Sequence, residues 1–136
     1  MKMLMEEWFV NPKSGCTYRN VSSETERFVM HYHDYFEIFL VTSGDIKHIV
    51  NGGEQNLKTG DLVFIRPNDI HDYECENARF INLALSHDTV DKLFAYFEES
   101  YPSRKLISAA MPPHVSLSET EYKNLVFQFE NLNTVH

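Results

Sequence analysis

The segment from His31 to Gly44, HYHDYFEIFLVTSG, carries residues that could bind a metal ion. His31 and His33 are separated by one residue, so their side chains fall on the same face of an extended segment. A turn near Asp34 would begin the next strand, from which Glu37 can point into the same space. Imidazole nitrogens and a carboxylate oxygen form a ligand set that suits Zn, Ni, Mn, Fe or Cu.

A second segment, GDLVFIRPNDIHDY from Gly60 to Tyr73, supplies a further imidazole. In this segment an apolar strand runs into a proline turn and then reaches His71. If these strands pair across a small barrel, His71 can reach the residues of the first segment. These residues of the two segments allow two interpretations. They are metal ligands, or they are polar residues that bind each other or an organic ligand. The residues are His31, His33, Glu37 and His71.

Two more polar residues are candidate contacts for a small organic effector. His48 shares a strand face with Ile46 and Val50, which places it on the interior side. A core histidine that bonds a neighbour is the alternative for this position. Tyr73 has the same parity as His71 and could bond a ligand hydroxyl, whereas a tyrosine at the rim of a barrel is the alternative.

These residues must be positioned by a fold that is mainly β up to about residue 86. Segments rich in β-branched or aromatic residues alternate with glycine and proline turns, which favours an antiparallel sandwich or barrel over βα units. Residues 35–41 are apolar on both faces, so this strand is predicted to be central. The predicted strands are 35–41, 46–50, 61–65 and 78–85, and the predicted turns are 42–45, 51–53, 58–61 and 66–69.

The hydrophobic period becomes helical in residues 86–100. The apolar stripe of this predicted helix consists of Val90, Leu93, Phe94 and Phe97. We therefore predict a first unit, residues 1–100, that contains an N-terminal arm, the barrel and this helix. Residues 101–136 form the second unit, which begins with a loop that contains prolines.

A second helix is predicted to begin at a capping box formed by Ser118 and Glu121. The apolar stripe of this helix could belong to the core or form a dimer seam. The position of the helix at the end of the domain favours the seam. The chain then stops without a glycine or proline stop signal, which suggests a longer polypeptide. The stripe consists of Tyr122, Leu125, Val126, Phe129 and Leu132.

The composition excludes several classes of protein. The 136 residues carry a net charge of −8, so their surface repels the phosphate backbone of nucleic acids. Cys16 and Cys75 follow no metal-binding or redox spacing and are expected to be reduced thiols in a cytoplasmic protein. No secretory signal is present, and no segment approaches the roughly 20 apolar residues of a membrane-spanning helix. We therefore expect a soluble protein without a membrane partner.

The spacing of the candidate ligands resembles the two sequence motifs of the cupin superfamily. Residues 31–44 read H-x-H-x3-E-x6-G, and residues 60–71 read G-D-x5-P-x3-H. The resemblance implies a small antiparallel β-barrel, and His31, His33, Glu37 and His71 match the positions that hold a divalent metal in metal-binding cupins. The chain departs from the motifs at Thr25, where the first often opens with glycine, and at Arg66, Asn68 and Cys75 in the second.

Most of the chain also resembles the N-terminal sensor domain of bacterial AraC-family transcription regulators. This resemblance rests on HYHDYFE, on GDLVFIRP and on the change from strand to helix after ARFINLALS. It implies that the barrel binds a small effector, often a sugar, and that a following helix makes a homodimer. DNA would be bound only through a C-terminal domain with two helix-turn-helix motifs, which these residues lack.

We therefore expect an effector-sensing and dimerisation domain of a transcription regulator. The alternative is a stand-alone metal-dependent cupin enzyme, of the dioxygenase or isomerase type, that uses its metal as a Lewis acid or to activate oxygen. The motifs reveal no additional acid/base pair, which counts against the enzyme. A metal-dependent binding module without catalysis is a third alternative.

Overall fold

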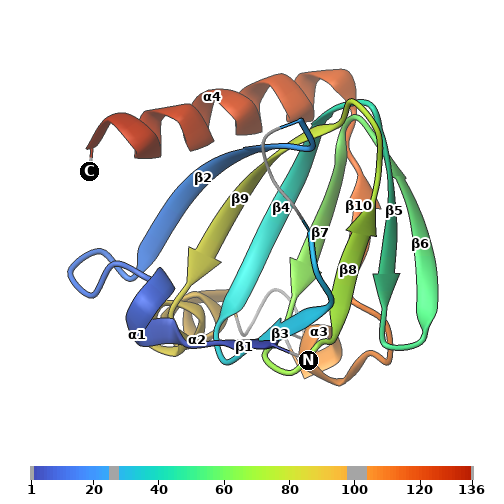
Figure 1. Ribbon diagram of the computed structural model, residues 1–136. Coiled ribbons are helices and arrows are strands. Elements are labelled where there is room, and N and C mark those ends of the chain that lie inside the picture. Colours follow the sequence, from blue (N-terminus) through green and yellow to red (C-terminus); the bar gives the residue numbers. More distant parts are fainter. Residues whose placement is uncertain (1, 25–27, 98–103, 136) are drawn as a thin grey trace.

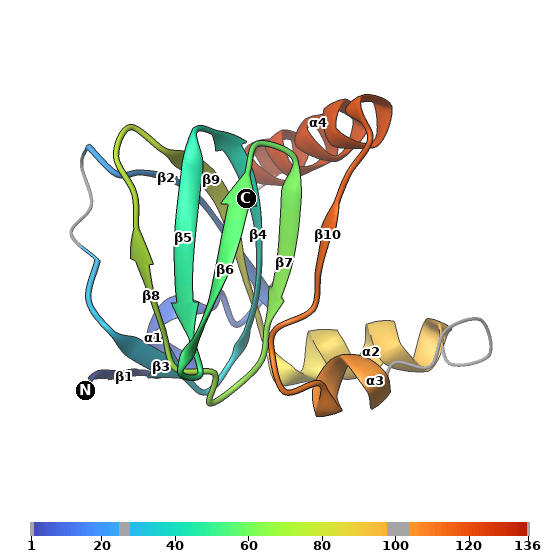
Figure 2. The ribbon, with the colours of Figure 1, turned by 90° about the vertical axis from the view of Figure 1, so that its right-hand side faces the viewer.

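Two five-stranded sheets face each other in the computed structural model, which describes residues 2–24, 28–97 and 104–135 (Figure 1 and Figure 2). The first sheet consists, in spatial order, of β1 (Lys2–Leu4), β3 (His31–His33), β8 (His71–Glu74), β5 (Asp45–Val50) and β6 (Gly53–Lys58). The second consists of β10 (His114–Ser116), β7 (Asp61–Ile65), β4 (Phe36–Ser43), β9 (Arg79–Leu85) and β2 (Cys16–Ser22). The helices are α1 (Glu6–Phe9), α2 (His87–Phe97), α3 (Arg104–Ser108) and α4 (Glu119–Val135). The prediction of a mainly β barrel followed by helices is confirmed.

The predicted strands match β4, β5, β7 and β9 to within two residues at either end. The turn between β4 and β5 requires its glycine, because Gly44 has a φ of 77° and an added Cβ would lie 2.8 Å from the Asn77 carbonyl oxygen. Strand β6 was not predicted, since its sequence GEQNLK is polar and lies between two glycine turns. It matters for the site because its Gln55 points inward.

The core lies between the sheets because side chains alternate along each strand. On the central strand β4, Phe39 and Val41 are fully buried in the interior cluster, while Phe36 and Leu40 pack on the outer face. The expectation that this strand is covered on both sides is therefore confirmed. The interior also contains Ile46, Leu57, Val63 and Ile65.

Helices α2 and α4 cover parts of the outer face of the second sheet, through Val90 and Phe129 respectively. Figures 1 and 2 place α4 at the end of the barrel opposite α1 and α2. The predicted capping box is confirmed: the Ser118 N–H donates to Glu121 Oε1 at 2.9 Å, and the Glu121 N–H donates to Ser118 Oγ at 3.2 Å.

The apolar stripe of α4 packs on the sheet of its own chain. Phe129 is 7% exposed, and Leu125 and Val126 pack against the same outer cluster. These contacts are those of the core alternative, and the dimer seam along this stripe stays a prediction. The side chain of Leu132 and the predicted boundary between residues 100 and 101 lie outside the described residues.

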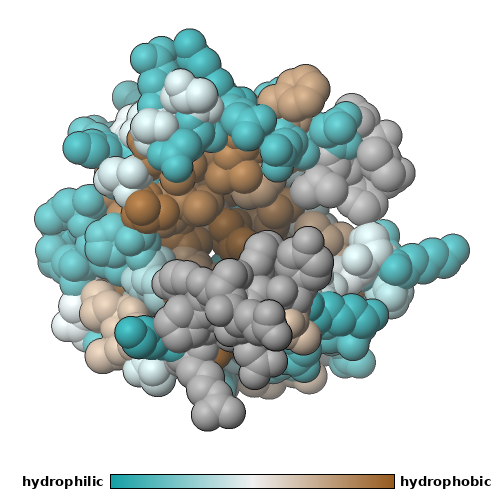
Figure 3. Space-filling view, turned by 180° about the vertical axis from the view of Figure 1, so that it is seen from behind, coloured by the Kyte–Doolittle hydropathy of each residue, from teal (hydrophilic) through white to brown (hydrophobic). Residues whose placement is uncertain are grey.

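An apolar hollow remains on the outer face of the second sheet, seen in Figure 3. A pocket of about 560 Å³ lies over this face, with Leu62 and Phe64 of β7 and Leu93 of α2 in its wall. Leu93 was predicted to lie in the helix stripe, yet it is 43% exposed because it borders this hollow. The Phe97 side chain is not among those described.

Two expectations from the composition concern membranes and disulfides. No helix in the described ranges is long and apolar enough to cross a membrane. Cys16 and Cys75 are both free thiols. Burial raises the pKa of each thiol, so both are poor nucleophiles at neutral pH.

Candidate metal centre and ligand pocket

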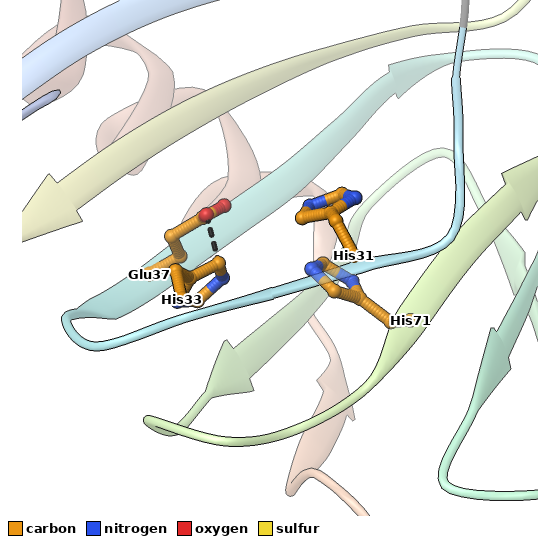
Figure 4. A group of neighbouring side chains, drawn as sticks. All are labelled: His31, His33, Glu37 and His71. Atoms are coloured by element: carbon orange, nitrogen blue, oxygen red, sulfur yellow. Dashed lines mark ion pairs between the residues drawn. The ribbon is translucent and has the colours of Figure 1, made fainter. Parts of the chain in front are cut away.

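The four candidate ligands meet inside the barrel (Figure 4). Strand β3 contributes His31 and His33, β4 of the opposite sheet contributes Glu37, and β8 contributes His71, which is the direct cross-strand partner of His31. One donor atom of each residue lies within 4.8 Å of the donor atoms of the others. His33 and His71 are fully buried and Glu37 is 4% exposed, so the group is largely shielded from water.

The hydrogen bonds of the β3 histidines leave their Nε2 atoms available as ligands. His31 Nδ1 lies 2.7 Å from the Val29 carbonyl oxygen, and His33 Nδ1 lies 2.7 Å from that of Tyr35. A carbonyl oxygen can only accept, so each Nδ1 carries a proton and donates it. Metal-ligating histidines in proteins hold their second nitrogen in this way, which fixes the ring and its tautomer.

His33 and Glu37 form a close ion pair. The Nε2 and Oε1 atoms are 2.7 Å apart, yet Nε2 has no partner with hydrogen-bond geometry among the described residues. Burial raises the pKa of Glu37, but the combined effects of His33, His71 and Asn82 outweigh burial and lower it to about 2. Burial lowers the pKa of His33, but Glu37, the Tyr35 carbonyl and Asp69 together outweigh burial and raise it. The carboxylate therefore needs a cation beside it, either an imidazolium proton or a metal ion.

The donor set fits a divalent metal. His71 Nε2 is a second buried atom without a hydrogen-bond partner in the described part of the chain. Burial lowers the pKa of His71 well below its ordinary value, so the ring is neutral at pH 7. Imidazole nitrogens that converge with one carboxylate match the ligand set that Zn, Ni, Mn or Fe would require.

His48 lies behind this group rather than in contact with open space. It is fully buried, its Nδ1 is 2.9 Å from Gln55 Oε1, and its Nε2 is 2.8 Å from His71 Nδ1. Burial lowers its pKa to about 4, so it is neutral. Both ring nitrogens of His48 are thus hydrogen-bonded. This predicted effector contact therefore lies behind the cluster and does not line the ligand pocket.

A pocket of about 300 Å³ opens beside the cluster and includes His31 and Glu37 in its wall. Tyr73, the other predicted effector contact, lines this pocket, and burial raises its pKa so that the phenol keeps its proton. The rest of the wall combines aromatic, aliphatic and polar side chains. It consists of Lys2, Leu4, Phe9, Arg19, Val21, Phe28, Val29, Tyr35, Phe80, Asn82 and Ala84.

Asn82 is a pocket residue that was not identified from the sequence. Its side chain bonds the Glu37 carboxylate, while its Oδ1 is buried and has no partner among the described residues. It is 9% exposed and lies on the inner face of β9, with Phe39 and Arg19 as its cross-strand neighbours. A lone asparagine at an inward position of the apolar strand RFINLAL was the signal that could have identified it.

The turn between β7 and β8 holds His71 in place. Asn68 has a φ of 73°, so this asparagine adopts the left-handed conformation usual for the glycine of the cupin motif. Its N–H donates to the His33 carbonyl oxygen at 3.0 Å, which ties this turn to β3. Arg66 and Asp69 close the turn with a buried ion pair of 2.8 Å. Arg66 and Asn68, two of the departures from the motif, therefore keep the ligand set together, whereas Thr25 lies outside the described residues.

A small two-sheet barrel that gathers three imidazoles and a carboxylate in its interior has the architecture of the cupin class. The sequence model of one family in this class, described as the AraC-like ligand binding domain, matches residues 15–108. The chain belongs to this family.

The curated relatives that match the chain are HTH-type transcriptional activators named RhaS. The activator RhaS of Yersinia pestis (strain Pestoides F) is 34% identical over 58 residues, which are 43% of this chain and 21% of RhaS. A structure of ToxT from Vibrio cholerae has a TM-score of 0.63 at 13% identity, over 85% of this chain and 47% of ToxT. Another, of ToxT bound to (E)-4-(8-methylnaphthalen-1-yl)but-3-enoic acid, has a TM-score of 0.60 at 13% identity, over 87% and 48%. The chain thus spans less than half the length of these proteins, and the ToxT similarity shows the fold.

Proposed function

We propose that this chain is the effector-sensing domain of a transcription regulator, and that the effector binds in the pocket beside Glu37 and His31. The observation that carries this proposal is a pocket of about 300 Å³ in the interior of an AraC-like ligand-binding domain. Its volume is at the lower end of the range for pockets that bind small molecules, about 300–1,000 Å³. A molecule the size of a monosaccharide is therefore a suitable occupant.

His31, His33, Glu37 and His71 are proposed to hold a divalent metal, of which Zn, Ni, Mn and Fe are the candidates. The unpartnered Nε2 atoms and the Glu37 carboxylate support this proposal. A bound metal would act as a Lewis acid that attracts oxygen atoms of the effector. The residues themselves orient the site, because backbone carbonyls fix two of the rings.

The pocket favours an effector that carries hydroxyl groups. Asn82 Oδ1 needs a donor, because an unpaired buried acceptor costs about 1–3 kcal/mol. The Tyr73 phenol keeps its proton, so it can donate to an oxygen atom of the effector. Phe28 and Phe80 offer apolar surface to the carbon skeleton. A sugar combines these features, and we propose this class.

Replacement of Asn82 by Leu tests this assignment. We expect the variant to bind a hydroxyl-bearing effector about tenfold more weakly, because one hydrogen bond of about 1.4 kcal/mol is lost. Thermal-shift screening of neutral monosaccharides, with and without Zn²⁺, would identify the effector, and calorimetry would compare the affinities. Asn20→Leu, on the exposed side of β2, is the matched control. Equal affinity of the Asn82 variant, or a response only to apolar acids, would contradict the assignment.

The similarity to transcription regulators favours effector binding over the stand-alone cupin enzyme. Among the described residues, the pocket wall contains no Ser/His/Asp arrangement and no carboxylate besides Glu37. Conversion of an identified effector during incubation with the metal-loaded protein, followed by NMR, would support the enzyme instead.

We also propose that the domain forms a homodimer, and that a DNA-binding domain outside these residues makes the contact with DNA. Phe127 supports a contact through α4, since it is 68% exposed on the side of the helix that the sheet does not cover. Light scattering at high micromolar concentration should show a dimer, and Phe127→Glu should shift it to the monomer. Gln128→Glu, at the next exposed position, should leave the dimer intact. A monomeric wild-type chain at that concentration would disprove dimerisation of this domain alone.

A further inference from the structure

A chain of buried hydrogen bonds connects the metal centre to the loop that leads toward α4. His71 Nδ1 and His48 Nε2 are 2.8 Å apart, His48 Nδ1 and Gln55 Oε1 are 2.9 Å apart, and Gln55 Nε2 donates to the Pro112 carbonyl oxygen at 2.8 Å. The two histidines are fully buried and Gln55 is 6% exposed. This series of hydrogen bonds crosses the first sheet from β8 through β5 to β6 and then leaves the sheet at Pro112.

We propose that His48 and Gln55 are positioning residues that hold His71 in the tautomer a metal requires and couple the metal centre to the segment from Pro112 to α4. This inference rests on the proposed metal site and effector-sensing function. It assigns His48 a role different from direct effector contact, and it gives Gln55 a role that the cupin motifs do not include.

The direction of every bond in this chain follows from its last acceptor. A proline carbonyl can only accept, so the Gln55 amide must present its NH₂ group to Pro112 and its Oε1 to His48. A neutral His48 then carries its proton on Nδ1 and accepts at Nε2. His71 must therefore donate from Nδ1, which leaves its Nε2 lone pair toward the cluster.

The opposite orientation of the Gln55 amide would disable the site. With NH₂ toward His48, the proton of that ring would move to Nε2, and His71 would accept at Nδ1. The His71 proton would then sit on Nε2, where the metal has to bind. The position of the Pro112 carbonyl thus selects the tautomer of a ring three hydrogen bonds away.

The segment after Pro112 is connected to the second sheet and to α4. The Phe64 N–H donates to the Pro113 carbonyl oxygen at 2.9 Å, β10 pairs with β7, and the Leu117 N–H donates to the Gly60 carbonyl oxygen at 3.0 Å. Helix α4 begins at Glu119. A ligand that tightens His71 would be expected to order this segment, because the bond from Gln55 to Pro112 joins the hydrogen bonds of His71 to its start. Such coupling requires that the ligand favour one arrangement of the segment over another.

The experiment combines three measurements on the full 136-residue chain. ¹⁵N NMR of the imidazole rings without metal reports the tautomers directly, and we expect His48 and His71 both to carry the proton on Nδ1. Titration with Ni²⁺ reports the affinity. Amide hydrogen exchange of residues 114–117, with and without Ni²⁺, reports the coupling, and we expect the metal to slow exchange in the wild type.

Variants separate the two halves of the proposal. Gln55→Leu should weaken Ni²⁺ binding about 10–100-fold, the usual effect of losing an outer-shell partner, and should remove the metal-dependent slowing. Asn56→Leu, exposed on the other face of β6, is the matched control. His48→Gln can still accept from His71 but loses the ring that reaches Gln55, so it should bind Ni²⁺ within a few-fold of wild type without slowing exchange.

The possible failures are distinguishable. A wild-type chain that binds no Ni²⁺ but shows both protons on Nδ1 would refute the metal site and not the tautomer relay. An Nε2–H tautomer of His71, or wild-type affinity in Gln55→Leu, would overturn the relay. Unchanged exchange at 114–117 on metal binding would overturn the coupling. The tautomer measurement uses the wild type, so it decides the relay even if a variant fails to fold.

Discussion

Replacement of His71 by Ala is expected to abolish metal-dependent stabilisation of the protein. His71 lies between the two β3 histidines and the His48 side chain, and its Nε2 faces the cluster with no hydrogen-bond partner in the described ranges. Loss of this ligand should reduce the affinity for Ni²⁺ or Zn²⁺ by about 100-fold or more, since loss of an outer-shell partner alone costs 10–100-fold. A metal at 100 times its Kd stabilises a folded protein by about 2.7 kcal/mol. At the same metal concentration the variant should keep at most about 0.4 kcal/mol of this stabilisation.

Thermal denaturation with and without the metal, together with metal analysis of the purified protein, would measure this effect. His87→Ala is the matched control, because His87 lies at the start of α2 and bonds the Asp34 carbonyl oxygen rather than the cluster. The metal-site proposal fails if His71→Ala retains the full metal-induced rise in Tm, or if wild-type protein prepared without chelator contains no metal and gains no stability from it.

The convergence of His31, His33 and Glu37 could be predicted because it follows from strand periodicity, whereas the placement of His71 rested on the resemblance to the cupin motifs. His31 and His33 share a face in any extended segment, and a short turn brings Glu37 back toward them. The central position of β4 could be predicted from the same alternation of side chains, because both faces of this strand are apolar. The packing of α4 on its own sheet could not be predicted, because an apolar stripe has the same pattern whether it faces a sheet or another chain.

The partners of the ligands were not accessible from the sequence, since they depend on the register between strands. His48 faces Gln55 and Tyr73 because β5 pairs with both β6 and β8 in one particular alignment. A shift by one residue would have turned Gln55 outward. Asn82 is a similar case, since only the pairing of β9 with β4 and β2 brings it beside Glu37.

The ion pair between Arg66 and Asp69 also emerges only in the structure. Both side chains are 7% exposed. Asp69 Oδ2 accepts from the backbone N–H and the Nε of Arg66, each at 2.8 Å, and Oδ1 accepts from Arg66 Nη2 and from Asn51 Nδ2. Arg66 Nη1 donates in turn to the Leu106 carbonyl oxygen of α3. This pair therefore joins the turn before His71 to the segment after α2.

Replacement of Asp69 by Ala should destabilise the metal-free protein by about 3–5 kcal/mol, because Arg66 would remain buried without its counterion. Glu74→Ala is the matched control: its ion pair with Lys47 is 3.6 Å long and exposed, so the cost should stay below about 1 kcal/mol. Urea unfolding in the presence of a chelator would measure both.

Burial raises the pKa of Asp69, but hydrogen bonds from Arg66 and Asn51 outweigh burial and lower it. The contribution of the carboxylate is therefore complete above the unfolded pKa of about 3.9 and disappears as the pH falls through the lower folded value. The difference between wild type and Asp69→Ala should shrink over that acidic range, and a cost below 1 kcal/mol at pH 7 would show that the pair does not hold this turn.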